Sequence, residues 1–213
     1  MVQQISPEKL KLLDLIKSRR SSKLLREVEV PTELIVAALE VASCAPSAHN
    51  AQPWRVVIVK DRPLIVKLLE EMAMVWRSDL RADGHPEWRI ETIVRESVKR
   101  TLRASALLVV CLTMDDMDVY PDERRRRFEY LMAVQSVAAF IQNLLLALHA
   151  LGLGACWRSG PLFAPEAVRR VLNVPEDVEP QALIEIGSPG GERPPRRRPL
   201  SEIAFMDKWG NPL

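Results

Sequence analysis

A run of residues without Asp, Glu, Lys or Arg, from Tyr130 to Trp157, constrains the fold more than any other feature of the chain. Its length alone admits a membrane-spanning helix. Polar side chains nevertheless recur in it at seven-residue spacing, which gathers them into one stripe along a helix. They are Gln135, Ser136, Gln142, Asn143 and His149. The run therefore predicts a buried central helix, from about Phe128 to Ala150, whose polar stripe faces a cofactor pocket or a subunit interface that supplies hydrogen bonds.

The rest of the chain alternates between helical and strand patterns. Helices are predicted at 7–17, capped by Ser6, and at 31–43, 63–76, 87–103 and after Pro165. Apolar strands are predicted at 54–60, 106–114, 153–158 and 180–187. This mixture predicts an α+β fold with a central sheet flanked by helices. The length of 213 residues fits a single domain over 1–213.

Composition excludes several classes of protein. Lys and Arg number 30 against 28 Asp and Glu, so the net charge of +2 gives no general case for nucleic-acid binding. The cysteines, Cys44, Cys111 and Cys156, are isolated, and three scattered histidines are weak grounds for a metal site, so no metal is predicted. Unpaired thiols and an N-terminus without an apolar signal core favour a cytoplasmic protein. Neither glycine-rich nucleotide loop is present.

Three polar clusters remain to be explained. "SRRSSK" supplies Arg19, Arg20, Ser21 and Lys23, which suit a phosphate, although a solvated helix end is the stronger interpretation of this segment alone. "CAPSAHNAQPW" places its polar residues directly before a strand. "RPPRRRPL" near the C-terminus is basic and stiffened by proline.

Taken together, these segments resemble the nitroreductase family of FMN-dependent oxidoreductases. Arg19–Lys23 matches an "R-[RH]-S-x-[RK]" segment, and Ala45–Trp54 matches "APS-x-x-N-x-QPW". Gly152–Gly160 matches "GLG-x-C-W" followed by small residues, and Arg197–Leu200 matches a late "R-x-P-L". Each match is a weak signal, whereas four in the family's order are strong.

The resemblance implies a nitroreductase-like fold and a homodimer that binds one FMN per chain, each FMN in contact with both chains. It assigns the phosphate and ribityl chain to the first and last segments. It assigns the pyrimidine edge to the loop and flavin N5 to the backbone N–H of Ser159 or Gly160. No catalytic side chain is predicted, because the flavin carries the hydride chemistry. The implied cofactor-binding residues are Arg19, Arg20, Ser21, Lys23, Pro46, Ser47, Asn50, Gln52, Asp79, Arg158, Ser159, Gly160 and Arg197.

The implied reaction transfers hydride from NAD(P)H through FMN to a nitro compound, a quinone or an enone. A narrower resemblance involves "VWRSDLRADG" (75–84) and the segment from Cys156 to Pro180. Both are similar to the flavin domain fused to γ-glutamyl ligases of deazaflavin synthesis, where Asp79 matches a cofactor-contacting aspartate. A deazaflavin as donor or substrate, and a flavin carrier without turnover, therefore remain alternatives.

Several single residues are ambiguous on sequence alone. His49 either donates to flavin or substrate or makes a local hydrogen bond, and the local bond is favoured. Asp79 is equally well explained as a helix cap. Trp76 and Trp157 are expected in the core, and Cys156 is expected to serve packing. The basic run Arg124–Arg127 is expected at a solvated helix start, with a landing site for an acidic ligand as the sharper alternative.

Overall fold

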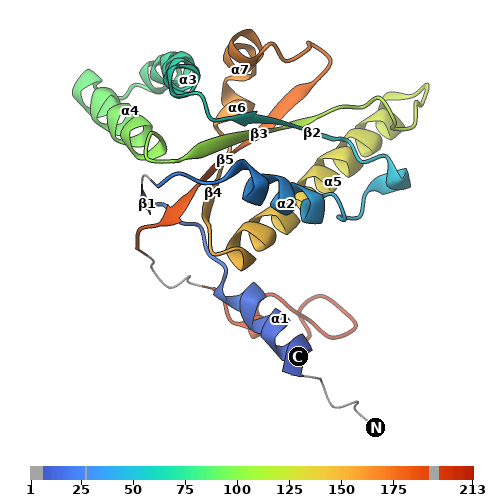
Figure 1. Ribbon diagram of the computed structural model, residues 1–213. Coiled ribbons are helices and arrows are strands. Elements are labelled where there is room, and N and C mark those ends of the chain that lie inside the picture. The colour runs from blue at the N-terminus through green and yellow to red at the C-terminus, as the bar shows by residue number, and fades with distance from the viewer. Residues whose placement is uncertain (1–6, 27, 192–196) are drawn as a thin grey trace.

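The structure is a computed structural model that describes residues 7–26, 28–191 and 197–213 (Figure 1). The first helices are α1 (Pro7–Ser18), α2 (Thr32–Ala42), α3 (Arg62–Ala82) and α4 (Glu87–Thr101). They are followed by α5 (Glu123–Ala150), α6 (Gly160–Phe163) and α7 (Pro165–Leu172). The strands are β1 (Leu25–Arg26), β2 (Trp54–Val59), β3 (Ala106–Leu112), β4 (Gly154–Arg158) and β5 (Glu179–Pro189). Short 3-10 turns cover Ala48–Asn50 and Leu200–Glu202.

The five strands form one antiparallel sheet in the order β1-β5-β3-β2, with β4 also paired to β5. β4 and β1 share the outer edge of β5. Gly154 lies opposite Gly187, and Leu25 lies opposite Pro189 two residues farther on. Figure 1 shows α2 and α5 on one face of this sheet and α3, α4 and α7 on the other. The fold thus has three layers.

β3 is buried over its whole length because both faces of the sheet are covered. Its alternating side chains divide between two cores: Leu108 and Val110 pack in the core that contains α5, whereas Leu107 and Val109 pack with α3 and α7. A strand in this position has no solvent-facing side, which explains why its sequence is continuously apolar rather than alternating.

The predicted central helix is confirmed as α5, which begins at Glu123, where the Asp122 side chain accepts a hydrogen bond from the N–H of Arg125 at 2.9 Å. By length and hydropathy this helix could cross a membrane, but half of its most apolar window is buried inside the fold. Its exposed first turn carries Arg124–Arg127, as expected for a solvated helix start. The buried side is apolar apart from Glu129 and Ser136.

Most predicted elements are confirmed within a few residues of their expected ends. α3 continues to Ala82, six residues past its predicted end, and β1 and α6 were not predicted. α6 is a single turn of four residues, too short to carry helical periodicity. β1 is two residues long and gains its pairing only from β5. The predicted cap Ser6 lies outside the described residues.

Candidate functional site

The first part of the site brings together residues from the two ends of the chain. Arg19 follows α1 directly, and Arg197 lies close enough to affect it electrostatically. Burial lowers the pKa of the Arg19 guanidinium, and repulsion by Arg197 lowers it further. Two like charges held together in this way favour a bound anion, which relieves the repulsion. We call Arg19 and Arg197 the arginine pair.

The segment after Arg19 is fixed against β4. Ser22 N–H donates to the carbonyl of Ala155 at 2.8 Å, and the buried Leu25 begins β1. The close approach depends on Gly154, because a Cβ there would lie 2.9 Å from Leu25 Cδ2 and 3.0 Å from Ser22 Cβ. Glycine therefore permits the contact that holds this part of the site. The predicted residues Arg20, Ser21 and Lys23 lie in the same segment, where Ser21 and Lys23 are exposed.

Arg158, at the far end of β4, is held by a buried carboxylate. Its Nε donates to Glu185 Oε1 at 3.1 Å and its second nitrogen donates to Oε2 at 3.3 Å. Thr101 Oγ1 from α4 also donates to Glu185 Oε1, at 2.6 Å. Burial by itself would lower the pKa of Arg158, but the charge of Glu185, the nearby Cys156 and the hydrogen bonds to Glu185 together raise it. Arg158 is therefore a fixed, permanently charged group.

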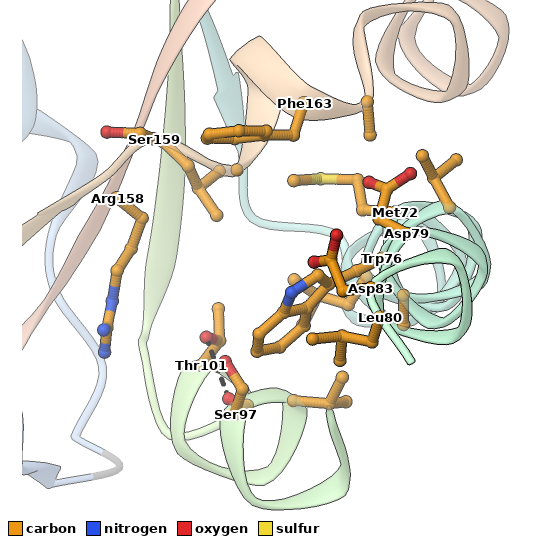
Figure 2. Close-up of a pocket in the computed structure, with 17 residues that line it drawn as sticks. Met72, Trp76, Asp79, Leu80, Asp83, Ser97, Thr101, Arg158, Ser159 and Phe163 are labelled. Atoms are coloured by element: carbon orange, nitrogen blue, oxygen red, sulfur yellow. Dashed lines mark hydrogen bonds between the residues drawn. The ribbon is translucent and has the colours of Figure 1, made fainter. Parts of the chain in front are cut away.

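Beside Arg158 lies a cavity of about 440 Å³ between α3, α4 and α6 (Figure 2). Its walls are mainly apolar, and Figure 2 shows Trp76, Asp79 and Asp83 projecting from α3 towards it, with Phe163 across the top. Ser159 and Gly160 also line it. The space thus adjoins the backbone predicted to face flavin N5. Asp79 lies in the last turn of α3, upstream of the helix cap Asp83.

The loop that contains Pro46, Ser47, Asn50 and Gln52, which we call the polar loop, lies elsewhere, at the N-terminal half of α5. Ala48 N–H donates to Ser136 Oγ at 3.1 Å, and Ser47 Oγ accepts from Gln52 N–H at 3.1 Å. His49, Asn50 and Gln52 all have positive φ, between 48° and 55°. Backbone of this kind is uncommon outside glycine and marks a loop whose shape is imposed by its contacts. Pro46, which is exposed, leads into this turn.

Within one chain the structure does not bring the loop and the arginine pair together. The loop contacts α5 at Ser136, whereas α1 contacts it at His149, where Ser18 Oγ lies 2.9 Å from Nε2. Thirteen residues separate these contacts, about 20 Å at 1.5 Å of rise per residue. Ser159 and Asp79 line the cavity beside α3 and α4, and Ser22, three residues after Arg19, is bonded to β4 at Ala155. β4 therefore connects the segment that carries Arg19 with the cavity.

Sequence reasoning missed Glu185 and Thr101, which look like ordinary strand and helix residues in the sequence. His49 contacts Glu129 at 3.3 Å, so the expected local hydrogen bond is replaced by a long-range one. Trp76 packs against the small core cluster of Ala73, Ile90 and Val94 and also lines the cavity. Trp157 is 39% exposed and is not a core residue. The three cysteines are free thiols. Burial raises the pKa of the Cys156 thiol, in agreement with a packing role.

The three-layer fold, the arginine pair and the polar loop agree with a family of flavin-dependent oxidoreductases. The chain belongs to the nitroreductase family, whose profile matches residues 16–188. A protein of Methanothermobacter thermautotrophicus with the provisional name NADH dehydrogenase/NAD(P)H nitroreductase is 32% identical over 204 residues, covering 94% of this chain and 89% of its own length.

Two solved structures have the same fold. A BluB-like flavoprotein from Clostridium difficile has a TM-score of 0.75 and 25% identity, and the match covers 92% of this chain and 99% of that one. The FMN-dependent nitroreductase NfnB from Mycobacterium smegmatis, in complex with NADPH, has a TM-score of 0.72 and 22% identity, with 93% and 99% covered. None of these three proteins is named as a deazaflavin ligase, so that narrower resemblance stays a prediction.

The Glu185 contacts generate a stability prediction. Glu185→Gln keeps the side-chain volume but removes the charge that Arg158 faces, so it should lower the free energy of unfolding by about 1.5–3 kcal/mol. The exposed Glu176→Gln is the matched control and should change it by less than about 0.5 kcal/mol. Urea denaturation of the three proteins measures the difference. Equal stability of Glu185→Gln and wild type would contradict the assigned role.

Proposed function

We propose that the protein is an FMN-dependent oxidoreductase that passes hydride from NAD(P)H to a small acceptor such as a nitro compound, a quinone or an enone. The observation that carries the proposal is the arginine pair, in which Arg19 and Arg197 are close enough for their charges to interact. A phosphate dianion is the ligand that such a pair suits best, because guanidinium groups bind phosphate through charge-assisted hydrogen bonds. FMN carries this group, and FMN-dependent NfnB shares the fold.

The residues around the pair fit the remainder of the cofactor. Arg20, Ser21 and Lys23 supply further donors, and β4 leads from Ala155, beside Ser22, towards the cavity at Ser159. We assign the pair to the phosphate and the backbone N–H of Ser159 or Gly160 to the flavin ring. Bound FMN supplies the hydride chemistry. The protein contributes binding, orientation and fixed dipoles where negative charge develops.

The loop would then belong to the site of a second copy of the chain. Pro46, Ser47, Asn50 and Gln52 sit about 20 Å along α5 from the contact with α1. A partner related by a two-fold axis can bring its polar loop to the arginine pair of the first chain. The same contact then forms a second time, with the roles of the two chains exchanged. We therefore propose a homodimer with two equivalent FMN sites, each built from the pair of one protomer and the loop of the other.

Exposed apolar side chains support a second copy. α1 leaves Leu12 and Ile16 about half exposed, and α5 does the same with Phe128 and Leu131. In the C-terminal segment Trp209 is 91% exposed, although its ring lies 4.8 Å from that of Phe205. Side chains of this type are concentrated at the buried centre of oligomeric interfaces. The remaining polar stripe of α5 includes the exposed Gln135 and Gln142.

The cavity is the proposed binding place for the hydride acceptor and donor in turn. Trp76, Phe163 and Met72 give it apolar walls suited to a flat aromatic molecule. The segment 75–84, which resembles the flavin domain of deazaflavin ligases, forms part of its α3 wall through Trp76 and Asp79. This placement favours a deazaflavin as the second candidate for donor or substrate.

The arginine pair predicts a loss of affinity that depends on the phosphate. Arg19→Ala and Arg197→Ala should each weaken FMN binding by roughly tenfold to a hundredfold, because one charge-assisted hydrogen bond contributes about 1.5–3 kcal/mol. Riboflavin lacks the phosphate and should bind both variants about as well as wild type. Fluorescence titration of the apoprotein with both ligands measures this.

Arg198→Ala, next in the chain and exposed, is the matched control and should bind FMN as wild type does. Arg196, the other neighbour, lies outside the described residues. If riboflavin loses as much affinity as FMN in the Arg19 and Arg197 variants, these arginines support the fold and the phosphate assignment is wrong.

The proposed activity predicts which reductants act on the loaded protein. Under nitrogen, NADH or NADPH should bleach the absorption of bound FMN, because the cavity beside Ser159 and Gly160 admits a nicotinamide donor. Reduced deazaflavin is tested in parallel, and dithionite serves as the control for a reducible flavin. Bleaching by deazaflavin alone would favour the second candidate. Bleaching by dithionite alone would identify a flavin carrier and contradict the oxidoreductase.

A further inference from the structure

Three potential metal ligands meet where the polar loop touches α5. His49 Nε2 lies 3.3 Å from Glu129 Oε1 and 3.9 Å from Asp118 Oδ2. One ligand atom from each residue lies within 4.8 Å of the other two. The residues come from three separate segments: the loop before β2, the connection between β3 and α5, and the second turn of α5.

Glu129 is the unusual member of this group. Its side chain is only 2% exposed, and its Oε2 has no hydrogen-bond partner among the described residues. A buried carboxylate oxygen without a partner is costly, because folding removes its water without replacing it. His49, the partner of Oε1, is held at a φ of 55°, a left-handed conformation that non-glycine residues seldom adopt. Both features indicate that something further binds here.

We propose that His49, Asp118 and Glu129 form a site for a divalent first-row transition-metal ion, with Zn²⁺ as the best probe. One imidazole nitrogen and two carboxylate oxygens suit such ions better than Mg²⁺ or Ca²⁺, which prefer oxygen ligands throughout. Metal–ligand bonds of about 2.1 Å in a tetrahedron place ligand atoms about 3.4 Å apart. The His49–Glu129 distance already matches, and the exposed Asp118, 3.9 Å from His49 Nε2, can approach both by rotation of its side chain.

The surroundings leave room for the ion and one further ligand. His49 is 42% exposed and Asp118 is 57% exposed, so the site opens to solvent on one side and water can complete the coordination. The nearby guanidinium of Arg125 is engaged by Asp122 and lies over the ring of Tyr120, 4.7 Å from its centroid. It therefore does not neutralise Glu129, for which neither a hydrogen bond nor an ion pair with this arginine is seen among the described residues.

An ion in this position would tie the polar loop to α5. His49 directly precedes Asn50. Ala48 already bonds to Ser136, which lies seven residues after Glu129 in α5. Metal binding would thus replace a single hydrogen bond to Glu129 by coordination bonds that fix the loop. The inference stands independently of FMN binding, because every ligand belongs to the same chain and none is assigned to the cofactor.

The test is Zn²⁺ binding by tag-free protein that has first been freed of metal with a chelator. Equilibrium dialysis should give about one Zn²⁺ per chain. His49→Ala, Asp118→Asn and Glu129→Gln should each weaken binding by about tenfold or more, since loss of even an outer contact costs that much. The matched controls His85→Ala and Asp116→Asn, which replace the same residue types elsewhere, should bind as wild type does.

Cobalt provides a readout that does not depend on stoichiometry. Co²⁺ in the wild-type site should give the intense visible absorption of a four- or five-coordinate ion, without the thiolate band that Cys44 would contribute, and Cys44→Ser should leave it unchanged. Asp118 is exposed, so Asp118→Asn tests the site even if the other variants unfold, which circular dichroism would reveal. Absence of Zn²⁺ binding by wild type, or equal binding by Asp118→Asn and Asp116→Asn, would overturn the proposal.

Discussion

α5 packs against both α2 and the sheet, and the positions of the polar loop and of α1 follow from this packing. It buries Phe140, Ile141, Leu144 and Leu148 against the strands and α2. Each such side chain contributes about 1.5–3 kcal/mol on burial, so the helix cannot shift without a large loss. The polar loop is fixed to it at Ser136, and α1 reaches it at His149. The helix thus acts as a rigid spacer between two parts of the proposed flavin site.

The fold also keeps charges in places where burial opposes them. Glu185 is 1% exposed, and its cost is offset because Arg158 and Thr101 both donate to it. Glu129 is as deeply buried, but only one of its oxygens has a partner among the described residues. Arg19 is held near a second arginine. Locally unfavourable arrangements of this kind are expected where a protein binds something, since packing alone does not select them.

The sequence predicts most of the fold because the buried elements have simple hydrophobic patterns. β3 and α5 are long apolar runs, and their burial follows from that. β1 and α6 are not predicted, because elements of two and four residues are too short to show a strand or helix periodicity. Only their neighbours in the fold stabilise them. The residue types mark Arg19 and Arg197 as basic, whereas their proximity depends on tertiary structure and is expected only from the family resemblance. His49, Asp118 and Glu129 share no spacing at all, since their ligand atoms converge only when three segments fold together.

If each flavin site combines the arginine pair of one protomer with the loop of its partner, two differently disabled chains should complement each other in a mixed dimer. Arg19→Ala disables the pair, and Asn50→Asp disables the loop while keeping a residue that tolerates positive φ. The two variants carry different affinity tags, so their heterodimer can be isolated and its bound FMN counted. We expect about one FMN per heterodimer, because a two-fold dimer of these chains has one intact site, and little FMN in either variant homodimer. A heterodimer that binds no more FMN than the variant homodimers would contradict this arrangement.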